Sequence, residues 1–352
     1  MSIQNPFSIS EKEKDYLQRG KQNPKALYLA HPNSVQEGFD YLYSTHPEFT
    51  PLESKDFLKN NPIQMMRDRG IPLRAIGSIM KIMGKIQKAS NQSWNDIEPY
   101  FENLSPVQFR TTLNLWNELN HFIERNWNDI EIGFTKLPSQ MIFKGKYTLF
   151  RYALVVSQEM KKDKIDQAPA FQAGKETMRV YASLGIIINK IAAWLRKKGI
   201  RSQSNHPMGG LVNTPSLAGK AGMGWQGRSG LLITPKYGPR VRLAPIFIEH
   251  KCFDFTDNQN HKWIENYCET CQICEKECPT KAINSKKAVI ITDVPGIGAM
   301  RTCIDREKCF EYFYKTSGCS VCIKVCPFSV GLNSYITLHE KEKTKMSTNQ
   351  EE

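Results

Sequence analysis

The ten cysteines are the residues of this 352-residue sequence best suited to chemistry, and all of them lie between positions 252 and 326. Four occur in YCETCQICEKECPTKAI, where the spacing C-x2-C-x2-C-x3-C-P supplies Cys268, Cys271, Cys274 and Cys278. Three thiolates at this spacing can surround one face of an iron–sulfur cube, and the proline after the fourth turns the chain so that Cys278 reaches a second cluster. The run therefore predicts metal binding and electron transfer through two [4Fe–4S] clusters.

A second run, KCFEYFYKTSGCSVCIKVCPFS, provides the remaining ligands of such a pair. We expect one cluster on Cys268, Cys271, Cys274 and Cys326, and the other on Cys278, Cys309, Cys319 and Cys322. Cys303 is the alternative to Cys309, which we prefer because it can begin a helix near the Gly318 turn. Cys252 is then left over as a small buried hydrophobic residue. Zinc is the competing metal, but zinc sites usually pair two C-x2-C hooks and do not need the longer run.

A glycine-rich stretch, AGMGWQGRSGLLITPKYGPRVRL, contains Gly222, Gly224 and Gly227 in the pattern G-x-G-x-x-G. A dinucleotide-binding turn needs a strand before these glycines, a helix after them and an acidic residue about twenty positions further on. Here the helix-like NTPSLAGK precedes the glycines, the strand-like GLLITP follows them, and the acid at that distance is Glu249 inside another predicted strand. Because this order is inverted, the pattern does not predict NAD binding.

These motifs are positioned by elements that the spacing of apolar residues predicts. We expect helices within 105–128 and 176–199, the second ending at Gly199, and buried strands in YTLFRYALVVSQEM, GLLITP and VRLAPIFIE. Strands that alternate with long helices indicate an α/β core. Residues 1–104, where IGSIMKIMGKIQKA has helical spacing, are expected to be mostly helical, and the polar end LHEKEKTKMSTNQEE to be disordered.

The composition is that of a soluble globular protein with a formal charge of +13. Two dianionic clusters with their thiolates would lower this charge to about +9. Lys and Arg are spread along the chain, so we expect a solvated basic surface instead of a specific nucleic-acid surface. The longest apolar run, GIIINKIAAWL, is interrupted by Asn189 and Lys190, which predicts no membrane span. The N-terminus has neither an apolar signal region nor a twin arginine, so the expected location is cytoplasmic, without a membrane partner.

The sequence resembles the cobalamin-dependent reductive dehalogenase family in RVYASLGIIINKIAAWLRKKGIRSQSN, in the glycine-rich stretch, in ALVVSQEM before them and in the cysteine runs after them. It is next most similar to epoxyqueuosine reductases, which share this module. The resemblance covers roughly residues 105–330 and implies an α/β nitroreductase-like corrinoid-binding core (105–255) followed by a bacterial ferredoxin-like two-cluster domain (256–335). With the helical N-terminal region (1–104), which shows no convincing match, and the polar tail (336–352), the expected fold class is α+β. The resemblance also implies base-off cobalamin, and no D-x-H-x-x-G motif supplies a histidine below the cobalt.

Under this resemblance, the glycine-rich loop is a wall of the corrinoid pocket, because glycines let the backbone approach a large flat ligand. The expected contacts are Thr214, Ser216, Gly222, Gly224, Gly227, Gly230 and Arg242. The family's catalytic tyrosine corresponds to Tyr181 in RVYASLG, which is expected to be a general acid, with Arg228 in GWQGRSG as its cationic partner. His206, in SNHPMGG, is expected to be a loop histidine and not a ligand.

The leading interpretation is a corrinoid- and iron–sulfur-dependent reductase. A ferredoxin or flavodoxin-like donor would pass electrons through two clusters to cobalamin, which would reduce and dehalogenate a small organic substrate. Epoxyqueuosine reduction on tRNA is the alternative, favoured by the basic charge. Against it, the helix at 176–199 has no acid after Glu176, where those enzymes carry an aspartate in GRDYH. A corrinoid-free ferredoxin-type electron carrier is the third interpretation, and it leaves the residues before the clusters without a role.

Overall fold

The computed structural model describes residues 73–101, 114–138, 141, 148–208, 210–283, 289–291, 300–302, 304–316 and 318–351. The described helices are, in chain order, α5 (Leu73–Asn95), η3 (Glu98–Phe101), α6 (Leu115–Asn126), α7 (Lys162–Ile165), α8 (Phe171–Lys197), α9 (Thr214–Lys220), α10 (Ile264–Cys271), α11 (Ile273–Lys276), α12 (Arg306–Lys315), α13 (Val321–Lys324), η5 (Pro327–Val330) and α14 (Leu332–Glu351). The described strands are β1 (Ile130–Lys136), β2 (Tyr152–Glu159), β3 (Ser202–Ser204), β4 (Trp225–Gln226), β5 (Leu232–Ile233), β6 (Val241–Ile248), β7 (Val289–Ile291) and β8 (Met300–Thr302).

The central sheet has the strand order β1-β2-β6-β3, and each neighbouring pair is antiparallel. This corrects the α/β core predicted from the alternation of strands and helices, because that class has parallel neighbours. The local unit β2–α8–β3 is nevertheless present, since both strands run antiparallel to β6 and therefore parallel to each other. The later strand β6 lies between them and pairs with both. The fold is thus α+β, and the order of elements along the chain does not reveal this insertion.

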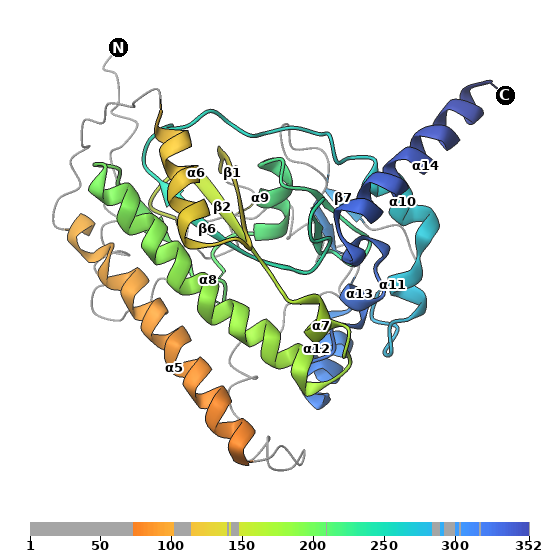
Figure 1. Ribbon diagram of the computed structural model, residues 1–352, viewed down its shortest axis with the longest axis horizontal. Coiled ribbons are helices and arrows are strands. Elements are labelled where there is room, and N and C mark those ends of the chain that lie inside the picture. Colours follow the sequence, from red (N-terminus) through yellow and green to blue (C-terminus); the bar gives the residue numbers. More distant parts are fainter. Residues whose placement is uncertain are drawn as a thin grey trace.

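The sheet divides the core into two layers of side chains. Leu154 and Val156 of β2 lie with Ile246 of β6 on the face covered by α6 and α8. Val155 and Phe247 lie on the opposite face, against α9 and the segment that follows it. This alternation is the period-two pattern of a sheet buried on both faces. In Figure 1, α5 lies outside α8, and the cysteine-bearing helices α10 to α13 gather at one end of the sheet, with α14 projecting beyond them.

Helix α8 is the central helix of the core. By length and composition it is apolar enough to cross a membrane, although the sequence analysis predicted no such segment, and 56% of its most apolar window is buried inside the protein. It packs between α5 and the sheet, so its hydrophobicity serves contacts on both sides. Gly199, with φ +80°, follows it in the left-handed conformation that commonly ends a helix, as predicted.

Asn189, which interrupts the apolar run of α8, attaches helix α5. Its Nδ2 donates to the backbone oxygen of Ala89 at 2.8 Å, and its Oδ1 accepts from Ser93 Oγ at 2.8 Å and from Ser204 Oγ at 2.6 Å. A buried amide is tolerated only when its donors and acceptors are paired, and here they are paired across three elements. The helical prediction for residues 1–104 is met by α5, while most of that region lies outside the described residues.

Three further elements differ from those expected from the sequence. The structure has a strand, β1, in IEIGFTK, where no strand was predicted, and GLLITP contributes only the two residues of β5, which pair with β4 outside the main sheet. The polar end of the chain was expected to be disordered but forms α14. The reason is that Tyr335 is buried against Trp263 and Phe328, so the beginning of α14 packs on the cysteine-bearing segment.

Gly318, immediately before Cys319, brings the cysteine-bearing segment against α8. Its φ is +135°, and a Cβ there would lie 2.2 Å from the Cα of Gly174. No side chain fits this contact, because the obstacle is backbone and cannot rotate away.

We expect Gly318→Ala to lower the free energy of unfolding by about 2–4 kcal/mol, because it combines a left-handed φ with overpacking. Gly84→Ala is the matched control: Gly84 lies inside α5 with no atom of the described residues within 4 Å of its Cβ position, so the variant should gain about 0.5–1 kcal/mol. Urea unfolding followed by circular dichroism, at equal iron content, measures both. A Gly318→Ala protein as stable as wild type would refute the close contact.

Candidate redox and catalytic site

The first cysteine run forms two short helices that meet at a sharp turn. Cys268 and Cys271 lie on α10, and Cys274 lies on α11. Gln272, between the helices, has φ 53°, a left-handed conformation that is uncommon outside glycine. The turn brings the thiols of both helices to one cavity, instead of letting a single helix spread them around its axis.

The second run repeats this geometry. Ser320 has φ 54° and precedes α13, which carries Cys322, just as Gln272 precedes α11 and Cys274. Both C-x-x-C turns therefore place a left-handed residue directly after their first cysteine. Cys326 follows α13, and Pro327 then begins η5.

The eight predicted ligands form two neighbouring groups. Burial and then the thiols of Cys268, Cys274 and Cys271 raise the pKa of Cys326 well above its usual range. Partial burial, followed by the thiols of Cys319 and Cys278, raises the pKa of Cys309 to about 11. Burial raises the pKa of Cys322 as well, with Cys309 and Cys319 next in importance. These interactions place Cys326 near Cys268, Cys271 and Cys274, and Cys309 near Cys319, Cys278 and Cys322, while Cys322 also interacts with Cys274. The assignment of the eight ligands to two clusters stays a prediction. Cys303 lies outside the described residues.

A cavity opens beside the first group. Its described lining includes Cys268, Cys271, Cys274 and Cys326, together with Cys322 of the second group. Trp225, whose indole nitrogen is buried without a hydrogen-bond partner among the described residues, packs in the same apolar cluster as Cys268. Within the described chain, no three His, Cys, Asp or Glu side chains converge on one point that would hold a single metal ion. A four-iron cluster needs a different arrangement, since its four thiolates surround a cube.

Arg228 lines this cavity and is ion-paired with the first cysteine run. Its Nη2 lies 2.5 Å from Glu275 Oε2, its Nε donates to the same oxygen at 2.6 Å, and its Nη1 lies 3.5 Å from Glu269 Oε2. The side chain is only 7% exposed. Next to it, a Cβ on Gly227 would lie 3.4 Å from Cys268 Sγ, so the glycine-rich loop touches the cysteine group directly.

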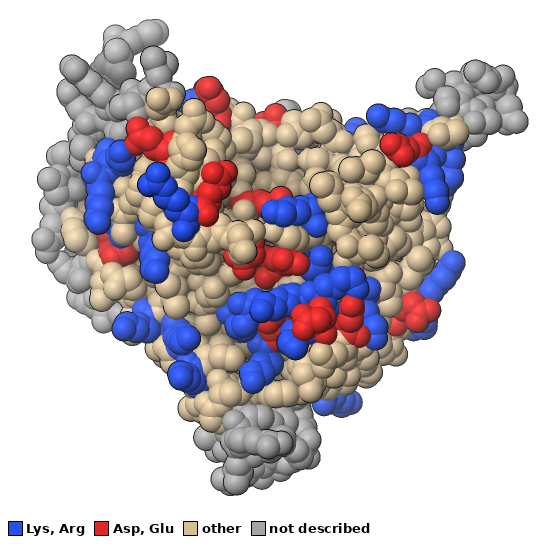
Figure 2. Space-filling model, viewed as in Figure 1, with Lys and Arg blue, Asp and Glu red and all other residues tan. Residues whose placement is uncertain are grey.

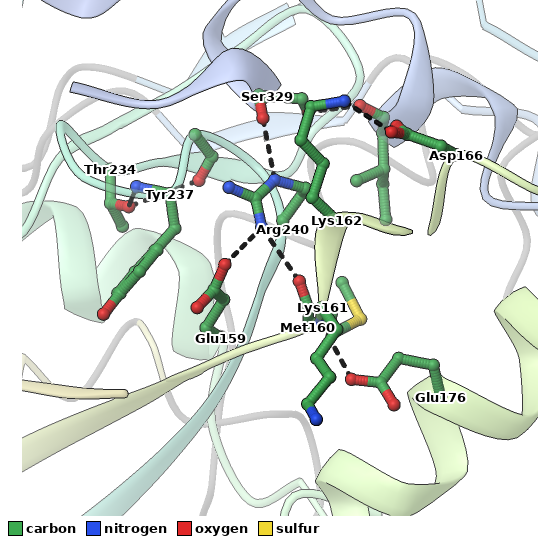
Figure 3. A network of polar contacts seen from close by, with 12 residues as sticks. Glu159, Met160, Lys161, Lys162, Asp166, Glu176, Thr234, Tyr237, Arg240 and Ser329 are labelled. Carbon is green, nitrogen blue, oxygen red and sulfur yellow. Dashed lines mark hydrogen bonds and ion pairs between the residues drawn. The ribbon is translucent and has the colours of Figure 1, made fainter. Parts of the chain in front are cut away.

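Arg240 connects the sheet with the segment after Cys326. Its Nε donates to the backbone oxygen of Ser329 at 2.8 Å, and its Nη1 bonds to Glu159 Oε1 at 2.5 Å and to the oxygen of Met160 at 2.9 Å. Figure 3 shows this buried guanidinium between the end of β2 and the cysteine-bearing segment. A charged group buried this deeply is stable only because each of these acceptors faces it.

Tyr181 lies half-buried on α8, facing the start of β6. The guanidinium of Arg242 sits over its ring, with 5.2 Å between Cζ and the ring centroid. Arg242 Nη2 also donates to Thr177 Oγ1, one turn before Tyr181, at 3.4 Å.

Gln158 extends this polar group on the adjacent strand, since it is the register partner of Arg242. Its Nε2 donates to Asp129 Oδ2 at 2.9 Å and to Ser183 Oγ at 3.0 Å. Gln158 Oε1 and Arg242 Nε are both buried without a partner among the described residues. An acceptor on β2 and a donor on its register partner in β6 therefore remain unsatisfied among the described residues.

Arg242, and not Arg228, is the arginine that the structure places over Tyr181. Arg228 was expected beside Tyr181, but it is ion-paired with Glu269 and Glu275 at the cysteines. The expectation that Arg242 contacts a corrinoid stays a prediction. The alternation of β6 explains the position of Arg242: Ala244 and Ile246 face α8, and Arg242 points the same way.

The other predicted corrinoid contacts are spread over the opposite side of the sheet. Thr214 and Ser216 lie on α9, where Thr214 Oγ1 donates to the oxygen of Val212 at 3.3 Å and Ser216 Oγ is buried without a partner among the described residues. They do not group with Arg242, because α9 covers the face away from α8.

The glycines of the loop contact the chain itself. A Cβ would lie 2.3 Å from Thr256 O at Gly222, 2.1 Å from Ile233 O at Gly224 and 2.5 Å from Ile233 Cδ1 at Gly227. Gly230, with φ +74°, lies in the β4–β5 turn. Packing of this loop against its neighbours therefore explains the first three glycines without a ligand.

His206 is a buried loop histidine that packs against α8. Its Nδ1 accepts a hydrogen bond from Met208 N at 3.2 Å, and its Nε2 has no partner among the described residues. A Cβ on Gly185 would lie 2.3 Å from that nitrogen, so the glycine makes room for the ring. Burial lowers the pKa of His206 to about 4.

We expect the free energy of unfolding to fall as the pH is lowered from about 6.5 to about 4. The unfolded chain takes up the histidine proton at a pKa of about 6.5, whereas folded His206 resists it until about 4, so this stabilisation is fully present above the window and lost within it. The difference between the two pKa values corresponds to about 3 kcal/mol of folding stability. Urea unfolding of wild type and His206→Gln across this range measures the effect. If both proteins lose stability equally, His206 is not its source.

Several residues of the site were not singled out in the sequence. Gln158 could have been identified from the sequence, because it continues the alternation of Leu154 and Val156. A polar side chain in that series points into the core. Glu269 and Glu275 lie inside the first cysteine run but have no pattern of their own, since their role depends on the distant Arg228.

Comparison with known proteins places the chain beside two kinds of enzyme. It is 29% identical over 188 residues to a tetrachloroethene reductive dehalogenase of Sulfurospirillum multivorans, which covers 51% of this chain and 35% of that protein. It is 28% identical over 196 residues to one of Desulfitobacterium hafniense, covering 52% and 34%. An epoxyqueuosine reductase of Francisella cf. novicida is 32% identical over 119 residues, covering 32% and 31%. No family model matches the chain.

A solved reductive dehalogenase, whose title refers to B12-dependent dehalogenation, has a TM-score of 0.53 at 21% identity, over 62% of this chain and 32% of that one. This supports a shared fold. The chain spans about a third of the length of the curated relatives it matches. The resemblance to reductive dehalogenases, with epoxyqueuosine reductases also similar, is confirmed.

Proposed function

We propose that this relative of the reductive dehalogenases is an iron–sulfur- and corrinoid-dependent oxidoreductase that reduces a small organic substrate. The observation that carries the proposal is the convergence of eight cysteines into two adjacent groups of four. Two adjacent clusters conduct single electrons, and they need an acceptor. The sheet beside them offers a half-buried tyrosine under a guanidinium, which is a suitable arrangement for proton delivery.

The cysteine groups suit [4Fe–4S] clusters in their donor chemistry. Cys268, Cys271, Cys274 and Cys326 would hold one, and Cys278, Cys309, Cys319 and Cys322 the other. The unpaired indole nitrogen of Trp225, in the apolar cluster around Cys268, suits hydrogen bonding to a cluster sulfur.

A corrinoid fits part of the predicted contact set. Arg242 keeps a buried nitrogen, Nε, without a partner in the described part of the chain, and such an atom suits the amide or phosphate groups of a corrinoid. Gly222, Gly224 and Gly227 would shape the loop without facing the ligand. When bound, cobalamin would supply a cobalt centre that transfers electrons to the substrate.

Tyr181 would supply the proton of the reaction. Replacing a carbon–halogen bond with a carbon–hydrogen bond takes two electrons and one proton and releases a halide ion. Tyr181 would donate that proton from its hydroxyl, and Arg242 would stabilise the resulting phenolate. The electrons would come from a ferredoxin or flavodoxin-like donor, and the cytoplasmic location expected from the sequence stays a prediction.

Reduction of epoxyqueuosine in tRNA is the second candidate, which the 32% identity to one such enzyme favours. A tRNA-binding protein usually presents clustered positive charge. On the face shown in Figure 2, Lys and Arg are interspersed with Asp and Glu and with uncharged surface. We therefore place the small-molecule reductase first.

The test is reconstitution of the purified chain with iron, sulfide and cobalamin, followed by electron paramagnetic resonance and a substrate panel. The panel contains haloaromatics, chlorinated ethenes and tRNA carrying epoxyqueuosine. Iron and cobalt in the protein, with halide release from one of the first two classes, would support the proposal. Iron without cobalt would refute the corrinoid, and turnover of the tRNA alone would establish the second candidate.

A further inference from the structure

Arg228 has no role in the proposed reaction, although it lies at the cysteines. It lies in the β4–β5 turn, far in sequence from the cysteines, and its guanidinium reaches into the first cysteine run. Among the described residues that line the cavity of the first cysteine group, Arg228 is the one with a permanent positive charge. The side chain is 7% exposed, so solvent screens this charge little.

The two acids that are ion-paired with Arg228 both lie within the first cysteine run. Glu269 lies between Cys268 and Cys271, and Glu275 follows Cys274 directly. Glu275 is the closer partner, through two contacts of 2.5 and 2.6 Å to one oxygen, and it is 18% exposed. One guanidinium thus connects the α10 side of the run with the α11 side, across the left-handed turn at Gln272.

We propose that Arg228 is a positioning residue that sets the reduction potential of the cluster on Cys268, Cys271, Cys274 and Cys326. The inference rests on the proposed function, because it requires that the cluster forms. Reduction adds one negative charge to the cluster. A buried cation beside it stabilises the reduced form more than the oxidised form, and nearby carboxylates do the opposite.

Removing the cation and removing the carboxylate of this ion pair should therefore shift the reduction potential of the cluster in opposite directions. Arg228→Gln removes the cation and leaves two carboxylates beside the cluster, so the equilibrium should shift toward the oxidised form by about tenfold, which is about 59 mV for a one-electron couple. Glu275→Gln removes a carboxylate and should shift the equilibrium toward the reduced form. Arg228→Lys keeps the charge but cannot form the forked contact, and it should lie between wild type and Arg228→Gln.

The experiment is a redox titration of the full chain, loaded with iron and sulfide and followed by electron paramagnetic resonance, without corrinoid or substrate. Arg201→Gln is the matched control. It breaks another buried arginine–glutamate pair, with Glu249, at the β3–β6 end of the sheet, and it should leave both cluster potentials unchanged.

Opposite shifts for Arg228→Gln and Glu275→Gln in one cluster signal, with none for Arg201→Gln, support the inference. Unchanged potentials in fully loaded variants overturn it and leave the proposed function intact. If Arg228→Gln does not fold, Arg228→Lys and Glu275→Gln still decide the sign. A wild-type chain that assembles no cluster overturns the inference and the proposed function together.

Discussion

Cys326→Ala is expected to remove about four of the eight iron atoms per chain and to abolish substrate reduction. Under the proposed function, Cys326 would be the ligand that the second run contributes to the first cluster, and burial together with Cys268, Cys274 and Cys271 raises the pKa of its thiol well above the usual range. Its loss leaves three thiolates, all from the first run. Cys309→Ala should remove the other four iron atoms, because Cys309 groups with Cys319 and Cys278. Iron and sulfide analysis with electron paramagnetic resonance measures both.

Cys252→Ala is the matched control for these variants. Cys252 is 4% exposed and packs in the core on the α8 face of the sheet, and burial raises the pKa of its thiol to about 12. It should keep all of its iron and lose only about 1 kcal/mol of stability from its smaller side chain. If Cys252→Ala loses iron while Cys309→Ala keeps it, the assignment of ligands is wrong.

Tyr181→Phe is expected to lower the rate of substrate reduction by about 10²–10⁴-fold, the usual contribution of a general acid. The ring remains, so its stacking under Arg242 at 5.2 Å is preserved and only the hydroxyl is lost. The main effect should be on kcat, with the cluster spectra unchanged. Arg242→Lys should retain more activity than Arg242→Gln, since it keeps a cation beside the phenol.

Tyr152→Phe is the matched control, because it removes a tyrosine hydroxyl at a different place in the core. Tyr152 stacks on Phe134 at 6.2 Å between ring centroids, at the opposite end of β2 from Gln158, and its change should leave the rate near that of wild type. Steady-state halide release by the reconstituted enzyme compares the variants. A Tyr181→Phe enzyme with the wild-type rate would rule out Tyr181 as the proton donor.

The sequence predicts local elements better than their arrangement. The apolar stripe of α8 and the β-branched run of β2 appear where the patterns place them, because both patterns follow from burial within one segment. The insertion of β6 between β2 and β3 depends on pairing between distant segments. The helix in the polar C-terminal segment likewise depends on a distant contact, because Tyr335 packs against Trp263, which lies 72 positions earlier.

The candidate site follows the same rule. The spacing of the cysteines predicts how seven of the thiols divide between two clusters, and it leaves Cys303 and Cys309 as alternatives for the eighth ligand. The partner of Tyr181 is not predictable, since Arg228, Arg240 and Arg242 lie within 15 positions and sequence offers no way to choose among them. In the structure, Arg242 lies over Tyr181, Arg240 is held by Ser329 and Glu159, and Arg228 lies at the cysteines.

Arg240 and Arg242 stand two residues apart at the start of β6. The first fastens the segment after Cys326 to the sheet, and the second covers Tyr181. Inserting or deleting one residue here would turn both side chains toward the wrong face at the same moment. Under the proposed function, one strand register would thus support both the supply of electrons and the supply of protons. A substitution would alter one arginine at a time, whereas a change in length at this strand would disturb both contacts at once.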